Sequence, residues 1–480
     1  MSILALLTWP LLALIVFARL PLPKAIIIAT IVPYLYLPEA FEIPLPALPD
    51  LDKTSIIAVG LILGVLFFGR KTGLPGAAPE IGETNRHFFW FIRGCLIILL
   101  VGVCFTVQNN SEGFWTGAVV LPGMRPWDAI GFLGKLVLTL TPFWFARRHL
   151  ATLAIQREFL KVLVWGGVIY SFLMLIEIRL SPQLHKWIYG YFQHSFLQHI
   201  RDGFRPMVFL QHGLWVGFFM LSATIAAFAL WKSSKNKMWL GLGVWLFLVL
   251  MISKNLGAFA ICIVLLGIFW LTRQRTQLIV IAVIAGSVLV YPALRNYNLI
   301  PLDSIMNWAN SVSADRAQSF GFRLENEDRL LDHTWNKPLT GWGGYGRNRV
   351  YSEDGNNITV TDGLWIIILS EWGWVGYLAY FGLLTIPAIF LVRVNRHREV
   401  PPEIIACGLI CAGNLIYMIP NATLTPVGVL TFGTLVAFIQ YKPQESAPIQ
   451  DATSTAPKRR NRYSRFSGNA ANKPALSHRR

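Results

Sequence analysis

The chain has 480 residues, of which 54% are hydrophobic and only 14% are charged, and its formal net charge is +17. Because an ordinary soluble domain is about 25% charged, so few charges could not cover the surface of a soluble globule. The composition therefore excludes a cytosolic enzyme, a disordered chain and a nucleic-acid-binding domain. The positive balance indicates anionic lipid or basic loops that face the cytoplasm.

Apolar segments of nearly membrane-spanning length follow one another along the chain, and a bilayer-crossing helix needs roughly 20 such residues. In chain order they are 2–18, 24–38, 55–69, 88–108, 128–145, 160–177, 208–231, 238–253, 256–271, 277–291, 363–392, 403–420 and 422–440. Several are short, so we expect about 12 to 13 transmembrane helices and an all-α polytopic membrane protein. The cysteines all lie within these runs, which indicates core or lipid-facing residues and not a disulfide framework.

Basic residues mark one side of this predicted bundle, because Lys and Arg collect at the cytoplasmic ends of spans. The basic, Ser- and Pro-rich tail 441–480 falls on that side and is predicted to be disordered. The exported side receives the loops 39–54, 109–127, 178–207 and 292–362. We therefore divide the chain into N-terminal helices with an interfacial loop (1–207), central helices (208–291), a large exported loop that is partly helical (292–362), C-terminal helices (363–440) and the tail.

Ionisable side chains at the exported ends of spans are costly in a membrane and are the first functional candidates. Lys254 lies at the tip of a predicted helical hairpin, either as a turn lysine that reaches the interface or as a cation beside an anionic headgroup. Arg205 precedes a span and is either an interfacial anchor or a second such cation. His212 is predicted about one turn inside that span, where it either donates to a carbonyl or accepts a proton.

The aromatic-rich segment 182–200 approximates a helical stripe, which predicts an interfacial helix lying on the membrane. Its histidines, His185, His194 and His199, do not have the spacing of a metal site. We therefore expect no metal.

The longest polar stretch, 292–362, contains seven Lys/Arg and nine Asp/Glu, and loops of this length are usually functional or disordered. Its tryptophans favour order. We predict a helix over 323–335 that carries Arg323 and Arg329 and ends at Asn336-Lys337-Pro338. The glycine-rich run 341–347, which ends in Arg347, fits either a tight turn or backbone that approaches a phosphate closely.

Two carboxylates lie near the end of this loop, one at its last residue and one in the span that follows. Asp362 immediately precedes the span 363–392, and we predict it as the helix N-cap. Glu371, together with Gly373 and Gly376, interrupts the span, which indicates a helix break or close helix packing.

Three short patterns, taken together, resemble the O-antigen ligase and polymerase superfamily of bacterial membrane glycosyltransferases. Ser253-Lys254-Asn255-Leu256-Gly257 is similar to the family's Ser-Arg-Gly helix start. Arg323, fifteen residues before Pro338 and followed by Gly341 and Gly343, resembles the family's arginine, helix and Pro-x-x-Gly-x-Gly. Asp362-Gly363, nine residues before Glu371, resembles the family's His-Asn start and Glu-x-Gly-x-x-Gly ending. The likeness covers about residues 200–395. Family ligases have histidine at the Asp362 position and arginine at the Lys254 position, which favours a polymerase here.

The resemblance implies a metal-independent reaction without cofactors in the bacterial inner membrane. The protein would transfer or polymerise glycan units carried on a polyprenyl diphosphate at the periplasmic face. Negative charge grows on the departing diphosphate, and preorganised cations stabilise it. Arg323 is the first candidate for this role. The remaining substrate-binding candidates are Arg205, Lys254, Arg347, Arg329 and Glu371.

The acceptor hydroxyl must also lose a proton to a positioned base. Asp362 is the candidate by position and His212 is the candidate by pKa. The implied partners are the lipid-linked donor, a glycan or lipid-linked acceptor, the bilayer and other polysaccharide export proteins, without nucleic acid.

Three alternatives remain at this stage. One is an O-antigen ligase that acts on a lipid A–core type acceptor. Another is a polysaccharide or lipid-linked sugar transporter or flippase, although the sequence has few mid-span charges and no internal repeat. A structural protein of the envelope is the third, and it would not need Arg323 or Asp362.

Overall fold

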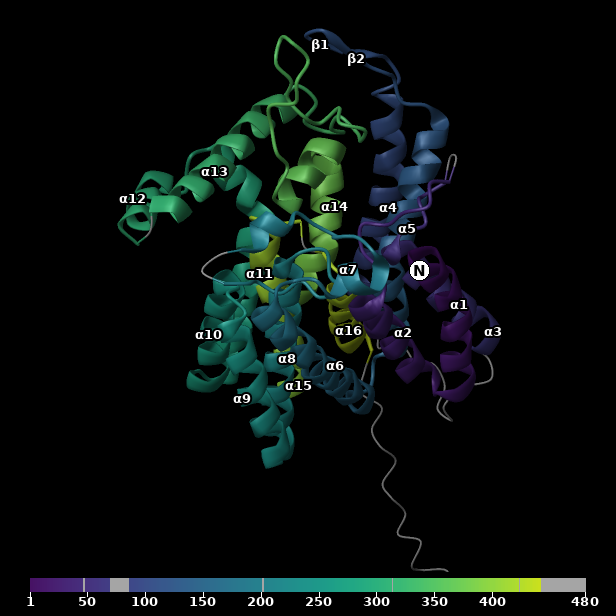
Figure 1. The fold of residues 1–480 in the computed structure, drawn as a ribbon, viewed down its shortest axis with the longest axis vertical. Helices are drawn as coiled ribbons and strands as arrows, with labels where there is room; N and C mark the ends of the chain where they lie inside the picture. The colour runs from purple at the N-terminus through teal and green to yellow at the C-terminus, as the bar shows by residue number, and fades with distance from the viewer. Residues whose placement is uncertain (46–47, 70–85, 201–202, 313, 423, 442–480) are drawn as a thin grey trace, which may run out of the picture. The chain divides into compact units, whose positions relative to one another are not determined.

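The computed structural model describes residues 1–480 except 46–47, 70–85, 201–202, 313, 423 and 442–480 (Figure 1). The predicted basic tail lies outside the described residues from 442 onward. Residues 1–443 form one compact unit. Within the described part of the chain, the regular secondary structure is almost all α-helix, with one short two-stranded sheet.

Each predicted apolar segment coincides with a helix, so the all-α prediction is confirmed. The helices are α1 (Ser2–Arg19), α2 (Leu22–Tyr36), α3 (Lys53–Phe68), α4 (Arg86–Gln108), α5 (Pro126–His149), α6 (Leu153–Leu180), α8 (Gly213–Ser234), α9 (Lys237–Ile252), α10 (Leu256–Leu271), α11 (Gln274–Asn296), α14 (Leu364–Val394), α15 (Pro402–Met418) and α16 (Pro426–Gln440). Among the described residues, 7 helices are long and apolar enough to cross a membrane: α1, α4, α5, α6, α8, α11 and α14. The other apolar helices are shorter.

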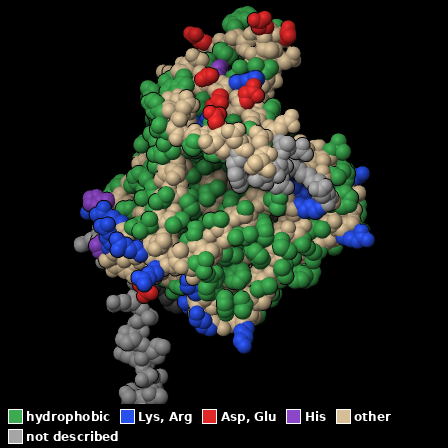
Figure 2. Space-filling view, turned by 90° about the vertical axis from the view of Figure 1, so that its left-hand side faces the viewer, with side chains coloured by type: hydrophobic (Ala, Val, Ile, Leu, Met, Phe, Trp, Pro, Cys, Tyr) green, Lys and Arg blue, Asp and Glu red, His purple; other side chains and the backbone are tan. Residues whose placement is uncertain are grey.

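The helices differ in how much of their apolar surface the protein itself covers. α8 packs against α6, α9, α10 and α15, and 83% of its apolar window is buried. In α1 and α4 only 28% is buried, and side chains such as Leu11 and Ile97 face outward. Figure 2 shows the other side of the molecule, that of α9, α10 and α13 (Ala314–Thr334), where hydrophobic side chains also form a broad area with Asp and Glu gathered above it. Such apolar exposure is what a lipid environment requires.

Polar connections at one end of the bundle contain most of the remaining structure (Figure 1). They comprise the hairpin β1 (Phe114–Thr116) and β2 (Val119–Leu121), α12 (Leu302–Val312) and α13 (Ala314–Thr334). α13 starts nine residues before the predicted start at Arg323. The loop is therefore more helical than its sequence indicated.

The predicted interfacial helix over 182–200 is wrong. The structure has a short helix α7 (Leu184–Tyr189), a break, and a 3₁₀ helix (Phe196–His199). Gly190 ends α7 in the left-handed conformation, with φ 93°. Glycine adopts this conformation without steric cost and so terminates helices.

A backbone crossing accounts for the glycines at 341–343 and 373. Gly373, with φ 64° and ψ −169°, kinks α14. The glycine run lies directly on this kink, since the N–H of Gly343 donates to the carbonyl of Glu371 over 2.8 Å. A Cβ on Gly341 would come within 2.5 Å of that carbonyl group. The predicted helix break is confirmed, and the glycines act in packing.

Candidate functional site

A cavity of about 1430 Å³ opens where the ends of several helices meet. Its wall comes from the segment before α8, the turn between α9 and α10, the helix α13, and the residues that precede α14 and follow α15. Apolar side chains from α8, α9, α10 and α13 share the wall with polar ones. The structure gathers here five predicted site residues from four parts of the chain: Arg205, His212, Lys254, Arg323 and Asp362.

Arg323 and Asp362 form an ion pair near the N-terminal end of α14, with 3.3 Å between Nε and Oδ2. Both side chains are about one-third exposed, at 34% and 38%, so a solute in the cavity can reach them. Arg323 also donates from Nη1 to the carbonyl of Pro420 at the end of α15. The N-cap prediction for Asp362 is wrong, because α14 begins one residue later with Gly363 as its N-cap. The Asp362 carboxylate pairs with Arg323 and does not cap the helix.

A residue of the turn between α9 and α10, Asn255, holds Arg205 in place. Its side chain is only 8% exposed, and Nε donates to Oδ1 of Asn255 over 2.6 Å. Gly213 and Gly217 leave room for this pair, because a Cβ at either position would come within 3.0 Å of Arg205 or Asn255 atoms. A rigid guanidinium of this kind suits oxyanion binding, since little conformational freedom is lost when the ligand arrives.

Lys254 occupies the same turn in a left-handed backbone conformation, with φ 58°. Residues other than glycine, asparagine and aspartate rarely adopt this conformation, and such strain collects at functional sites. The ammonium lies against Gly203, where a Cβ would come within 2.6 Å of Nζ. The cavity thus has three cationic side chains and one carboxylate among its described lining residues.

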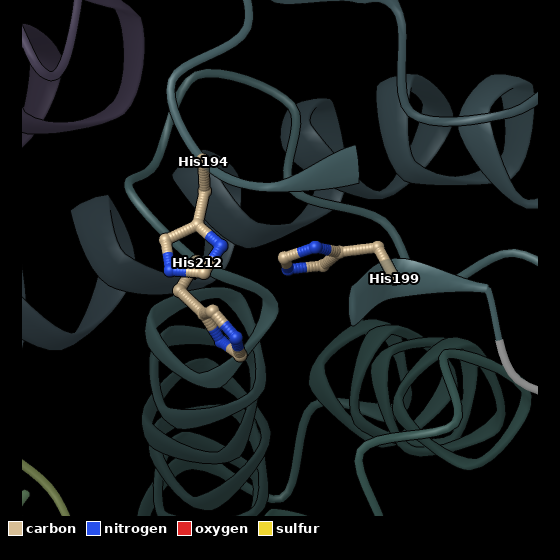
Figure 3. A group of neighbouring side chains, drawn as sticks. All are labelled: His194, His199 and His212. Atoms are coloured by element: carbon tan, nitrogen blue, oxygen red, sulfur yellow. The ribbon is translucent and has the colours of Figure 1, made fainter. Parts of the chain in front are cut away.

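Three imidazole rings converge beside the cavity, from His194, His199 and His212 (Figure 3). Their nearest nitrogens all lie within 4.8 Å of one another, a spacing that could hold a metal ion. The sequence did not anticipate this cluster, since His212 comes from a different segment. His212 is the N-cap of α8 and not a residue one turn inside it, which corrects the prediction.

Backbone N–H groups fix the protonation of two of these rings. The N–H of Leu214 donates to Nδ1 of His212 over 3.0 Å, and the N–H of Gly213 donates to Nε2 of His199 over 3.3 Å. A neutral imidazole has one acceptor nitrogen, so each ring already uses its lone pair. A metal ion that bound through Nδ1 of His212 or Nε2 of His199 would have to displace these backbone donors.

The structure places the other three predicted site residues outside this cavity. Arg347 is 2% exposed and donates to the carbonyl of Pro122 over 2.8 Å. Arg329 forms an exposed ion pair with Glu325 on the surface of α13. Glu371 belongs to the glycine crossing described above. None of the three is among the residues that line the cavity.

Sequence reasoning missed the residues that follow α15. Pro420 and Asn421 line the cavity and lie nearly 100 residues after Arg323, which touches the first of them. The available signal was the Pro-Asn pair between two apolar runs, which indicates a turn between two helices. Nothing in that signal says which loop it meets. Asn255 was noted only as part of a motif, although it anchors Arg205.

No protein-family model matches the chain, and no curated protein matches it. The function therefore has to be argued from the cavity. Its concentration of cations beside apolar side chains suits an amphipathic anion, and the carboxylate of Asp362 can serve as a proton acceptor.

Proposed function

We propose that the protein is a membrane-embedded glycosyltransferase of the polymerase type. It would transfer a glycan unit from a polyprenyl diphosphate to the hydroxyl of an acceptor glycan, without a metal, at the periplasmic face of the bacterial inner membrane. One observation carries this proposal: Arg205, Lys254, Arg323 and Asp362 line a single cavity at the ends of apolar helices.

The cations support stabilisation of the leaving group. When the bond between the anomeric carbon and the phosphate oxygen breaks, the electron pair leaves with the polyprenyl diphosphate. Fixed cations that meet this charge stabilise the transition state more than the ground state. Arg323 can offer two parallel N–H groups to a phosphate, whereas Lys254 acts as a point charge.

Asp362 is the better candidate for the base. The acceptor oxygen attacks the anomeric carbon and its proton passes to the carboxylate, so the products are the extended glycan, polyprenyl diphosphate and a protonated Asp362. In the resting structure Asp362 is paired with Arg323. A diphosphate that engages Arg323 would release the carboxylate for the acceptor. His212 is less suitable, because its lone pair already accepts the N–H of Leu214.

The position of the cavity supports the proposed sidedness. It lies at the start of α8, whereas Lys232 and Lys235 lie at the other end of that helix, about 30 Å away. Basic residues at the far end are typical of the cytoplasmic side. The apolar lining residues Leu214, Met251 and Leu256 offer a surface for the first isoprene units of the donor.

Cells that lack the protein, complemented with variants, provide the test. We expect Arg323→Ala to leave glycans of a single repeat and to abolish long chains, while Arg329→Ala on the same helix preserves them. Membrane fractionation confirms that both variants are inserted. Full-length polymer stranded on its lipid carrier would indicate a ligase instead. Unchanged chain length and abundance in both Arg323→Ala and Asp362→Ala would refute the enzyme proposal.

A further inference from the structure

A second cavity, of about 560 Å³, lies between α3, α4 and α5 and shares no residue with the first. Its size falls within the roughly 300–1,000 Å³ of ligand sites in proteins. Its wall is almost wholly apolar, with Ile62 from α3, Leu96, Ile97 and Leu100 from α4, and Val137, Leu140 and Trp144 from α5. Ile97 and Val137 are more than half exposed, so the groove opens onto the apolar outer surface.

Among the described residues of this wall, Arg93 has the one ionisable side chain. It is exposed and lies seven residues into α4, which places its Cα about 10 Å along the helix from Arg86. A charge at this depth on a lipid-facing surface is costly unless it finds a partner. Its guanidinium rests on the rings of Phe89 and Trp90, at 4.1 and 5.4 Å from their centroids. Aromatic faces position a cation and leave its charge unneutralised.

A second guanidinium contacts the same aromatic ring. Arg147, only 4% exposed, lies 5.2 Å from the centroid of Phe89, and its Nε donates to the neutral amide of Gln440. In the part of the chain that the structure describes, no ion pair joins Arg93 or Arg147 to a carboxylate. Two cations next to an apolar groove therefore have no carboxylate partner among the described residues, and a buried charge without a counter-charge is destabilising.

We propose that this groove binds an anionic phospholipid, with one acyl chain between α4 and α5 and the phosphate at Arg93. The apolar wall accounts for the chain, and the exposed guanidinium of Arg93 accounts for the headgroup, since guanidinium binds phosphate through two parallel N–H groups. The buried Arg147 adds positive charge next to it. A neutral, zwitterionic lipid would fill the groove equally well and would leave the excess positive charge unexplained. The groove faces the membrane, so a lipid is the occupant that can reach it.

Lipid binding to the purified, delipidated full-length protein in detergent tests this site. Native mass spectrometry compares phosphatidylglycerol with phosphatidylcholine of the same acyl chains. We expect the wild type to prefer phosphatidylglycerol. Arg93→Gln should weaken phosphatidylglycerol binding roughly fivefold, because each basic residue at a membrane surface contributes about that factor to the binding of an anionic lipid. Phosphatidylcholine binding should weaken less, because choline already neutralises the phosphate. Val137→Trp, which fills the groove, should weaken both lipids.

Arg148→Gln is the matched control, because Arg148 is an exposed cation at the same end of α5 that does not line the groove. It should bind both lipids like the wild type. Equal affinity of the wild type for the two lipids would overturn the proposal. So would an equal loss in Arg93→Gln and Arg148→Gln, which would indicate unspecific surface charge. The result is independent of sugar transfer, so the proposed function stands or falls separately.

Discussion

The cavity and the glycine crossing each take an arginine from the same long connection, 292–362, yet the fold uses the two arginines in different ways. Arg323 and Asp362 are each about one-third exposed and face an open space. Arg347 is 2% exposed and uses its N–H groups to fasten 341–347 to the segment before α5. On sequence alone, Arg323 was the first candidate for binding the diphosphate, and Arg347 was one of the remaining candidates.

The comparison shows what separates a binding cation from a structural one. An arginine can bind a substrate only if its donors remain accessible after the chain has folded. Buried polar groups need internal partners, so an arginine that is covered by the protein becomes part of the packing. Exposure to a shared cavity is therefore what distinguishes a substrate-binding arginine from a structural one. The following experiments probe the cavity, the glycine crossing and residues outside both.

The largest effect is expected at the cavity. Arg323→Ala should lower the transfer rate by about 10²–10³-fold, because a preorganised donor to the developing anion is lost. Arg323→Lys should recover only part of this, since a point charge does not reproduce the guanidinium fork. Turnover of a synthetic lipid-linked oligosaccharide by the purified variants measures both. A thermal midpoint like that of the wild type is the control, and full activity in Arg323→Ala would contradict the comparison.

At the glycine crossing, the expected effect is on stability. Arg347→Ala leaves the Pro122 carbonyl without its donor and should lower the free energy of unfolding by about 2–3 kcal/mol. Thermal unfolding in detergent measures the loss, and the exposed neighbour Arg349 provides the matched alanine control. If Arg347→Ala kept its thermal midpoint and lost transfer activity, Arg347 would belong with the substrate-binding residues after all.

A buried histidine outside both regions gives a pH-dependent test. His185 is 1% exposed, and burial lowers its pKa to about 4, with the Tyr191 carbonyl acting in the opposite direction. A lowered pKa means that the folded state resists protonation, so stability is complete above the unfolded pKa near 6.5 and falls toward pH 4. The loss should reach about 2 kcal/mol by pH 5.

Thermal unfolding between pH 7.5 and 5 measures this dependence. His185→Gln removes the titrating group, so its midpoint should change less across the same range. Parallel curves for the wild type and His185→Gln would show that other groups govern the acid sensitivity.

The smallest effect is expected on the outer surface of α13. Arg329 pairs with Glu325 one turn away, and both side chains are about half exposed, at 45% and 62%. Exposed pairs of this type contribute about 0.3–0.5 kcal/mol. Arg329→Ala should therefore change the thermal midpoint by no more than a degree or two and leave turnover near the wild-type value. A loss of activity comparable to that of Arg323→Ala would extend the site beyond the cavity.

Local patterns predicted the helices well. Hydrophobic length is a property of consecutive residues, and each apolar run became a helix close to its expected bounds. The break at Glu371–Gly373 was also readable, because glycine in an apolar helix signals a kink or close approach. The prediction of one helix over the aromatic segment 182–200 was wrong, because a stripe of aromatic residues does not indicate that the chain turns at Gly190.

By itself the sequence determined the helical class, the apolar segments and a set of charged candidates at their ends. Only the tertiary structure decided that Arg205, Lys254, Arg323 and Asp362 share a cavity, that Arg347 is buried in packing, and that His212 meets the two histidines of segment 182–200. The physical reason is that hydrophobic periodicity acts over neighbouring residues. Which helix ends meet, by contrast, depends on how the whole bundle packs.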